Sequence, residues 1–287
     1  MEFQDNICNN LSIQIPNPSP DRICDYGLHL INSILAELGY TLLHFPKMPL
    51  SHENWTHVNS NYLITDQLNY DYDRETQSFR QHMENVQSVP EQLDAYQRIV
   101  NAIFKGLGGI FFLSCPGGTG KAYVYKTICH HLCLEGKIVL YVASSGIAAL
   151  LLPGGHTAHS TFRIPIDFLD AESLCNISKQ DQHVELLRAV NLIIWDEALM
   201  QSRFTHKAIN HTLCNICNNK STPFGGKPVI FGGDFQQTLP VLPKSSQKDI
   251  INAFLPQSYL WKDLQVLNLR TNMWLTQSTP DKQHFAN

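Results

Sequence analysis

The sequence has no excess of positive charge. Lys and Arg number 21 against 25 Asp and Glu, which gives a formal net charge of −4 over 287 residues. Charged residues make up only 16% of the chain, below the average of about a quarter for soluble proteins. The chain as a whole therefore has no attraction for nucleic-acid phosphates, and any such contact has to come from a local groove.

Charged residues are absent altogether from one long stretch, Ile138 to Phe162. Its length would suffice to span a bilayer. Turn-forming residues interrupt it at Ser144-Ser145-Gly146 and Pro153-Gly154-Gly155, so we expect a buried strand, a turn and a short apolar helix instead. The start, MEFQDN, also lacks the basic and apolar parts of a secretory signal peptide. These absences favour an intracellular protein without a membrane span.

A second pair of closely spaced cysteines is missing as well. The sequence has eight cysteines, of which Cys214 and Cys217 form a C-x-x-C with no partner pair at zinc-finger spacing. The stretch CHHLC, residues 129–133, could supply other ligands, but a structural zinc needs four converging groups. We expect reduced cysteines and assign no metal cluster.

The first part of the chain carries few chemical signals. Residues 26–38 space Leu and Ile along one helical face, with Gly39 placed to end the helix. Residues 51–88 are polar and indicate helix or linker. We therefore divide the chain into a mainly helical and irregular N-terminal segment, 1–88, and a second domain, 89–287.

From about residue 90, apolar runs alternate with helical patterns. We expect strands at 110–114, 137–143, 190–195 and 228–231, and helices at 91–105, 122–133, 148–152 and 207–217. Strands that are apolar throughout and alternate with helices indicate a parallel sheet covered on both faces. The predicted fold class is α/β, with a parallel sheet flanked by helices.

A glycine-rich turn, CPGGTGKA (115–122), lies between the first strand and the next helix. Its backbone N–H groups and the start of the helix can surround phosphate, while Lys121 reaches the β- and γ-phosphates. Two positions depart from the pattern G-x-x-x-x-G-K-[ST], since Cys115 replaces the first Gly and Ala122 replaces the hydroxyl residue. These letters alone leave open an intact loop, a damaged loop and a chance match.

Two later strand ends supply matching chemistry. Asp196 and Glu197 follow the apolar run LIIW, where Asp196 can hold Mg²⁺ and Glu197 can deprotonate an attacking water. An acidic turn after a strand is the plain alternative. The segment FGGDFQQTLP, 231–240, follows another strand and offers the amide of Gln237 as a γ-phosphate sensor. Together the three segments predict a P-loop NTPase that binds ATP with Mg²⁺.

The order of these segments resembles one family. EQLDAY, CPGGTGKA, ASSGIAALLLPGGHTAHSTFRIP, IIWDEALM and GGDFQQTLPVLP are similar to the motifs of PIF-type 5′-to-3′ ATP-dependent DNA helicases of superfamily one, and of their Helitron-like branch. The similarity runs from about residue 88 to 275. It implies a RecA-like domain that binds ATP and single-stranded DNA. It also implies family roles in DNA unwinding, DNA-damage repair, recombination and telomere maintenance, and a nuclear location.

The resemblance also assigns single residues. Gln92 corresponds to the glutamine that reads adenine, Gln237 to the γ-phosphate sensor, Asp196 to the Mg²⁺ ligand and Glu197 to the catalytic base. The implied ATP-binding set is Gln92, Pro116, Gly117, Gly118, Thr119, Gly120, Lys121 and Ala122. The implied single-stranded DNA contacts are Ser145, Gly146, Thr157, His159 and Ser160. Outside the family context, a hydrogen-bonded loop histidine is the plain interpretation of His159.

Several departures concern ATP turnover. Ala122 removes a hydroxyl that ligates Mg²⁺, and Cys115 is expected to strain the turn. Trp274 stands where the family has an arginine that stabilises the transition state, with Arg270 as a weaker substitute. The chain also ends at Asn287, where we expect the second RecA-like domain to be absent.

We therefore expect a helicase domain that binds ATP and DNA but is impaired in hydrolysis. The alternative is a non-catalytic module that binds single-stranded DNA or a protein partner. A small-molecule kinase is a more distant possibility, because nothing in the sequence indicates a substrate lid.

Overall fold

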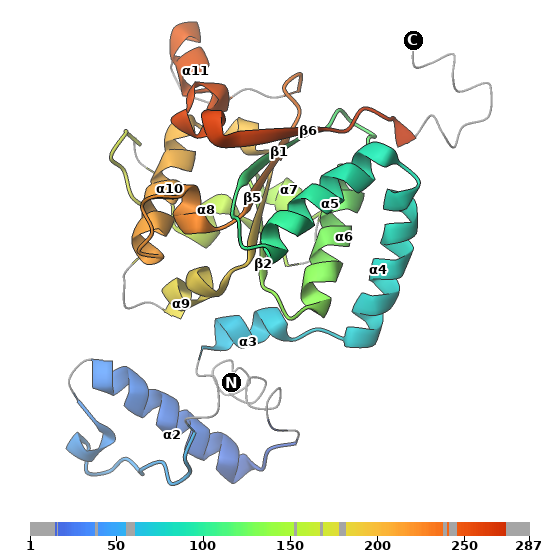
Figure 1. Cartoon of the computed structure of the whole chain (residues 1–287). Coiled ribbons are helices and arrows are strands. Elements are labelled where there is room, and N and C mark those ends of the chain that lie inside the picture. Colours follow the sequence, from blue (N-terminus) through green and yellow to red (C-terminus); the bar gives the residue numbers. More distant parts are fainter. Residues whose placement is uncertain are drawn as a thin grey trace. The chain divides into compact units, whose positions relative to one another are not determined.

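The computed structural model describes residues 15, 17–37, 40–55, 61–151, 154–166, 169–177, 182–237, 240 and 246–273. By its internal contacts the chain divides into two compact units, Met1–Asn69 and Tyr70–Asn287. Figure 1 labels the elements of both units, which we describe separately. Within the described ranges, none of the helices has the length and apolarity that crossing a membrane requires.

The first unit is built on one long helix, α2 (Pro20–Glu37), followed by the short helices η1 (Leu42–His44) and α3 (Tyr62–Leu68). Tyr26 on α2 packs against Trp55, with ring centroids 5.2 Å apart. Ile15, Ile23 and Leu30 lie partly buried against this pair. Among the described residues of this unit the apolar cluster is small, so polar contacts carry more of the structure that they form.

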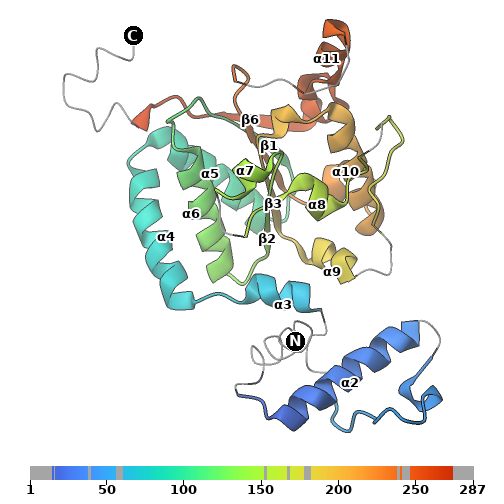
Figure 2. The ribbon, with the colours of Figure 1, turned by 180° about the vertical axis from the view of Figure 1, so that it is seen from behind.

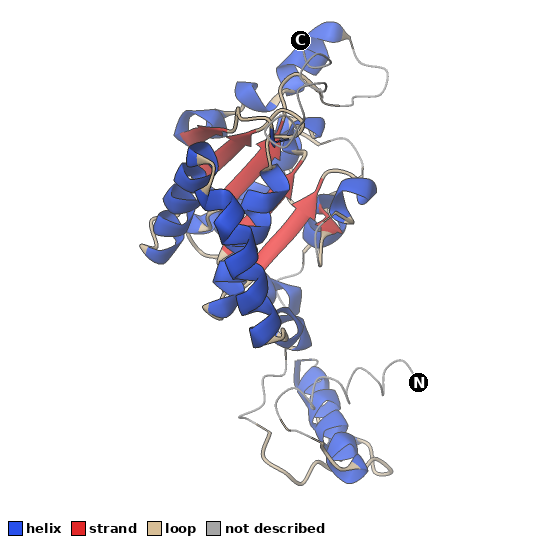
Figure 3. Ribbon diagram, turned by 90° about the vertical axis from the view of Figure 1, so that its right-hand side faces the viewer, coloured by secondary structure: helices blue, strands red, loops and turns tan. Residues whose placement is uncertain are grey.

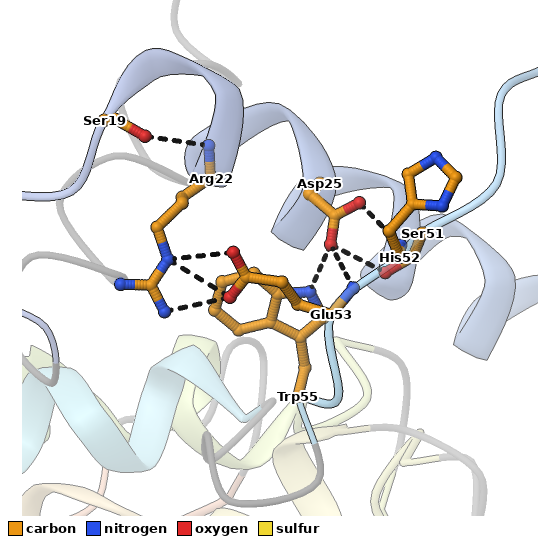
Figure 4. Close-up of polar contacts among 7 residues, drawn as sticks. All are labelled: Ser19, Arg22, Asp25, Ser51, His52, Glu53 and Trp55. Atoms are coloured by element: carbon orange, nitrogen blue, oxygen red, sulfur yellow. Dashed lines mark hydrogen bonds and ion pairs between the residues drawn. The ribbon is translucent and has the colours of Figure 1, made fainter.

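One carboxylate, that of Asp25 on α2, holds the returning segment of this unit. It accepts four hydrogen bonds, from Ser51 Oγ at 3.0 Å, His52 N at 2.7 Å, Glu53 N at 3.0 Å and Trp55 Nε1 at 2.8 Å (Figure 4). Burial opposes ionisation, but the four donors lower the pKa of Asp25 to about 2. Arg22 adds an ion pair to Glu53 at 2.9 Å.

The second unit contains a six-stranded sheet in the order β3-β2-β4-β5-β1-β6, with every pairing parallel. Its strands are β1 (Ile110–Ser114), β2 (Val139–Ala143), β3 (His156–Thr157), β4 (Leu192–Asp196), β5 (Val229–Gly233) and β6 (Leu264–Asn268). The order is not sequential, so helices cross over between the strands, as parallel pairing requires.

Helices cover both faces of this sheet. The α-helices are α4 (Tyr72–Gln87), α5 (Pro90–Phe104), α6 (Lys121–Leu134), α7 (Gly146–Ala149), α8 (Ala158–Phe162), α9 (Gln182–Ala189), α10 (Arg203–Ile216) and α11 (Gln247–Ala253). Helices α4, α5 and α6 lie on one face, and α8, α9 and α10 lie on the other (Figures 1 and 2). The sheet runs between the two helical layers in the side view of Figure 3.

Short helical turns complete this unit, namely η2 (Ala198–Met200), η3 (Pro223–Gly226), η4 (Leu255–Gln257) and η5 (Tyr259–Asp263).

The central strands form the core between the two helical layers. All five residues of β4 and all five of β5 are buried. Strands covered on both faces lack polar alternation, as the apolar runs of the sequence predict.

The register of the sheet determines where the loops meet. Ser114 at the end of β1 lies opposite Gly233 of β5, and Ala143 at the end of β2 lies opposite Asp196 of β4. Four loops therefore leave the sheet at the same edge. In open parallel sheets this edge, at the carboxyl ends of the strands, is where ligands bind.

The α/β fold with a helix-flanked parallel sheet is confirmed, and the predicted strand at 110–114 matches β1 at both ends. The helix expected at 91–105 is α5, one residue earlier at each end, because Pro90 suits the first helical turn. The short helix expected at 148–152 begins earlier, at Gly146, because the Ser145 side chain caps its N-terminus. The predicted helix-ending Gly39 lies outside the described residues.

The compact unit begins earlier than the boundary drawn at residue 88. Helix α4 belongs to it, since α4 packs along α6 and Val86 is fully buried there. Phe79 and Met83 are partly buried against the same core. The polar composition of residues 51–88 conceals this narrow apolar stripe.

Candidate nucleotide site

Residues 115–120 form the turn between β1 and α6. Gly118 and Gly120 have φ values of 80° and 85°, in the left-handed region that favours glycine. At Gly120 a Cβ atom would lie 2.3 Å from Nε2 of Gln92, so a side chain has no room there. That same Nε2 donates a hydrogen bond of 2.9 Å to the Thr119 carbonyl. Gln92, buried on α5, therefore supports the turn from beneath.

Cys115 does not strain the turn, contrary to the expectation from its sequence position. Among the described residues with positive φ outside glycine, Cys115 does not occur. Its thiol is buried and donates to the Leu113 carbonyl at 3.1 Å. Burial raises the pKa of this thiol to about 12, so it is protonated at neutral pH.

Lys121, the first residue of α6, lies between two carboxylates. Its Nζ atom is 2.6 Å from Asp196 Oδ1 and 2.7 Å from Glu197 Oε1. Burial alone would lower the pKa of Lys121, but the two carboxylates raise it above its ordinary value. The ammonium is therefore charged, and it is positioned at the end of the turn where phosphate oxygens would lie.

Glu197 has a left-handed backbone with φ 51°. This conformation is uncommon outside glycine, and residues that adopt it cluster at functional sites. The Glu197 N–H donates to Asp196 Oδ1 at 3.0 Å, which stabilises the sharp turn after β4. The two adjacent carboxylates of this strand end consequently meet at the same Lys121 ammonium.

A cavity of about 590 Å³ opens above these groups. Its lining includes every residue that the sequence assigned to ATP, Mg²⁺ and catalysis, namely Gln92, Pro116, Gly117, Gly118, Thr119, Gly120, Lys121, Ala122, Asp196, Glu197 and Gln237. A Cβ atom on Gly117 would lie 3.7 Å from Nε2 of Gln237, so this amide is placed over the turn. The structure brings the set together, and the individual roles remain predictions.

The carboxylates suit a hard cation. Oxygen ligands are those that Mg²⁺ prefers, and Asp196 is positioned at the strand end with only 6% of its surface exposed. Within the part of the chain that the structure describes, no three His, Cys, Asp or Glu side chains converge as a metal cage. A Mg²⁺ ion here would be completed by phosphate oxygens and water, as is usual for this metal.

The cavity also contains residues that the sequence did not single out for this site. They are Asn85, Tyr123, Tyr141, Leu151, Asp234 and Met273. Tyr141 had a signal in the sequence, because it interrupts an otherwise aliphatic strand, KIVLYVA. Met273 had no such signal, because it comes from a part of the sequence distant from the turn. Its N–H donates to the Gly118 carbonyl at 2.8 Å.

Glu91 anchors the segment that leads to Met273. One carboxylate oxygen of Glu91 accepts from Arg270 N at 2.6 Å and from Thr271 N at 3.1 Å. The Arg270 side chain is exposed and does not line the cavity, so its suggested role beside the phosphates gains no support here. Trp274 lies outside the described residues.

The residues predicted to contact DNA gather beyond β2 and β3. Ala143 pairs with Thr157, which brings α7 and α8 to one edge of the sheet. The Ser145 hydroxyl accepts from Ala148 N at 3.2 Å, and the Thr157 hydroxyl accepts from Ser160 N at 3.2 Å. These hydroxyls therefore cap the two short helices, a structural task that is compatible with a DNA contact but does not require one.

The surface around these caps is uncharged and partly apolar. Gly146 is exposed, and Ile147 and Leu150 beside it are 81% and 85% exposed. Burial lowers the pKa of His159, so its imidazole is neutral at physiological pH. Any nucleic acid here would meet hydroxyls, backbone and apolar side chains rather than a basic patch.

The glycine turn, the lysine between paired carboxylates and the parallel sheet define a P-loop nucleotide-binding domain of RecA-like type. The profile of the PIF1-like helicases matches residues 87–287, and the chain belongs to this family. It is 33% identical over 150 residues to an ATP-dependent DNA helicase Pif1 from Psychrobacter sp., covering 52% of this chain and 22% of that protein. It is 31% identical over 169 residues to the helicase RRM3 of Saccharomyces cerevisiae, covering 58% and 23%.

Solved structures give the same result for the fold. A Pif1 helicase from Bacteroides in complex with ADP-AlF3 and single-stranded DNA superposes with a TM-score of 0.55 at 26% identity, over 66% of this chain and 44% of that one. Unliganded Pif1 from Bacteroides sp. gives a TM-score of 0.52 at 27% identity, over 66% and 43%. The chain thus spans less than half the length of these relatives.

Proposed function

We propose that this chain is the ATP- and single-stranded-DNA-binding domain of a PIF-type DNA helicase. One observation carries the proposal, namely the Lys121 ammonium held between Asp196 and Glu197 on the floor of the cavity. A half-buried lysine with two carboxylates next to a glycine turn is well suited to exchange a carboxylate for a phosphate. Family membership and the Pif1 complex with ADP-AlF3 and single-stranded DNA support the same assignment.

The residues divide the work of binding ATP. The N–H groups of the turn and the start of α6 surround the phosphates, and Lys121 neutralises part of their charge. Asp196 would hold Mg²⁺, which supplies further charge neutralisation at the β- and γ-phosphates when it is bound. Departure of Lys121 towards the phosphates frees both carboxylates for these tasks.

Glu197 and Gln237 would act at the γ-phosphate. Glu197, on its left-handed backbone, lines the cavity and can accept a proton from an attacking water. The Gln237 amide, next to Gly117, can bind a γ-phosphate oxygen without adding charge. Removal of either group is expected to slow hydrolysis more than it weakens ATP binding.

We further propose that hydrolysis is slow in this chain. Ala122 lies at the cavity and presents no oxygen to a Mg²⁺ ion. DNA would cross the edge formed by α7 and α8, with backbone against hydroxyls and bases against the exposed Ile147 and Leu150. The Helitron-like branch, a nuclear location and roles in repair, recombination and telomere maintenance belong to the same proposal and rest on the family alone.

Binding and turnover of ATP test this function. Titration of the purified chain with a fluorescent ATP analogue should show saturable binding that requires Mg²⁺ and is lost in Lys121→Ala. Single-stranded DNA should stimulate hydrolysis, but only weakly. A chain that binds neither Mg²⁺-nucleotide nor single-stranded DNA would refute the proposal, and rapid DNA-stimulated hydrolysis would refute the impaired turnover.

A second candidate function is a non-catalytic module that binds single-stranded DNA or a protein partner. Ala122 is the observation that favours it, because the loop lacks its usual Mg²⁺ ligand. DNA binding whose affinity is the same with and without Mg²⁺-nucleotide would identify such a module. A DNA affinity that changes with nucleotide would identify the helicase domain.

A further inference from the structure

The Mg²⁺ position of this site is one oxygen ligand short. Ala122 follows Lys121 on the first turn of α6 and is exposed to the cavity. The family pattern places a hydroxyl at this position. The site either tolerates this loss or finds a hydroxyl elsewhere.

Two tyrosines with buried hydroxyls lie near Asp196. Tyr125 is one helical turn after Lys121 and has 0% of its surface exposed, while Tyr141 on β2 has 5%. By hydrogen-bond geometry neither hydroxyl has a partner among the described residues, and the interaction nearest to one is that of the Tyr141 hydroxyl with the Asp196 carboxylate. The two rings meet edge to face, with centroids 6.0 Å apart.

The packing around Gly232 places the Tyr125 hydroxyl close to the Asp196 carboxylate. A Cβ atom on Gly232 would lie 1.8 Å from the Tyr125 hydroxyl and 3.0 Å from Asp196 Oδ1, so phenol and carboxylate meet in the space that glycine leaves. The Tyr141 hydroxyl interacts with the same Asp196 carboxylate, so both phenols lie beside this side chain. A phenol with an ordinary pKa of about 10 is a hydrogen-bond donor at neutral pH, and Tyr141 also lines the cavity.

A buried hydroxyl without a partner is unfavourable and rare in folded proteins. Two of them beside the same carboxylate call for a ligand that supplies the missing partners. Mg²⁺ keeps several of its waters when a protein binds it, and those waters both donate and accept hydrogen bonds. A neutral phenol can hold such a water although it is a poor direct ligand.

We propose that Tyr141, supported by Tyr125, positions the hydrated Mg²⁺ at Asp196 and so replaces the hydroxyl that Ala122 lacks. This inference rests on the proposed nucleotide site. Tyr141 is a positioning residue, because it acts through water and Asp196. Its contribution lies in the Mg²⁺ dependence of nucleotide binding, and nucleotide affinity without the metal does not depend on it.

The test measures Mg²⁺ binding and does not use turnover. The full chain is titrated with MgCl₂ at a fixed concentration of fluorescent ADP, and the midpoint of the Mg²⁺-dependent signal is compared between variants. Tyr141→Phe should raise this midpoint about five- to tenfold, the loss of one hydrogen bond near a charge. Affinity for the same nucleotide in EDTA should not change. Tyr125→Phe should shift the midpoint in the same direction by a smaller factor.

Tyr96→Phe is the matched control. Tyr96 belongs to the same apolar core, but its hydroxyl bonds His131 at 2.7 Å and does not line the cavity. This variant should leave the Mg²⁺ midpoint unchanged. Tyr141→Phe should not lower the unfolding temperature, because it removes an unpaired hydroxyl, whereas Tyr96→Phe should lower it.

Rescue completes the experiment. Ala122→Thr in the Tyr141→Phe background should restore the midpoint, since the hydroxyl returns to its usual position. An unchanged midpoint in Tyr141→Phe, with wild-type Mg²⁺-dependent binding intact, would overturn the inference and leave the proposed function standing. A wild-type chain without any Mg²⁺-dependent nucleotide binding would overturn both.

Discussion

Two aspartates of this chain show how differently a protein can use the same side chain. Asp25 in the first unit receives four hydrogen bonds from its own chain, through both carboxylate oxygens. Asp196 in the second unit meets Lys121 and the Glu197 N–H, both at Oδ1, while two phenols nearby have no partners. A carboxylate whose donors are all supplied by its own fold is structural. The unpaired hydroxyls beside Asp196 are the feature on which the proposed ligand site rests.

The largest expected effect is a loss of nucleotide affinity at the site that contains Asp196. Lys121→Ala removes the cation that faces the phosphates and leaves Asp196 and Glu197 to repel them. A charge-assisted hydrogen bond contributes about 3 kcal/mol, so nucleotide affinity should fall about 100-fold. Isothermal titration calorimetry measures the loss. An affinity within a factor of three of wild type would contradict the assigned role of Lys121.

A substitution at Asp25 should lower the stability of the first unit and leave nucleotide affinity unchanged. Asp25→Ala leaves the Trp55 and backbone donors without an acceptor and should destabilise the first unit by about 2–3 kcal/mol. Limited proteolysis should then cut within residues 17–55 at lower protease concentration. Nucleotide affinity should stay at its wild-type value, because the described residues that line the cavity all belong to the second unit. A parallel loss of nucleotide binding would break the comparison.

A gain in Mg²⁺-dependent nucleotide affinity is expected when the missing hydroxyl at position 122 is restored. Ala122→Thr adds a hydroxyl at the exposed first turn of α6 and should tighten Mg²⁺-dependent nucleotide binding about fivefold, or about 1 kcal/mol. Hydrolysis should rise with it. Ala122→Val, which has the same shape without the hydroxyl, is the matched control and should not improve binding. Equal effects of Thr and Val would show that shape, and not the hydroxyl, matters.

The smallest expected effect is a pH dependence of the first unit. The pKa of Asp25 is lowered to about 2 from an ordinary value of 3.8. A group with a lowered folded-state pKa stabilises the fold above its unfolded value, and this contribution is lost as the pH falls through the folded value. Proteolytic resistance should therefore drop between about pH 4 and pH 2. Asp25→Asn should flatten the drop, and an unchanged acid profile would speak against the assignment.

The fold was predictable where local pattern decides it. The strand at 110–114 and the helix at 91–105 are set by apolar spacing and a well-placed proline, so sequence alone located them within a residue. Strand β6 escaped prediction because three of its five residues are exposed, which hides it at the edge of the sheet. Its place beside β1 depends on a partner far away in the chain.

The site was predictable as a set, but its internal contacts were not. The motifs follow strands of a parallel sheet, and such strands end at one edge, so the sequence predicted that their residues would meet. The turn, Asp196, Glu197 and Gln237 do line one cavity. The strain expected at Cys115 was wrong, since a motif does not report the backbone angle that a residue adopts. The contacts of Met273 and the unpaired phenols arise from packing between distant segments, for which the sequence holds no local signal.

One pair of neighbours on α5 has a mechanical consequence. Gln92 is bonded to the carbonyl of Thr119, and the preceding residue, Glu91, holds the backbone of residues 270 and 271. The first turn of this helix is thus hydrogen-bonded both to the glycine-rich turn and to residues 270 and 271. When one of them shifts, the other has to follow or give up a hydrogen bond.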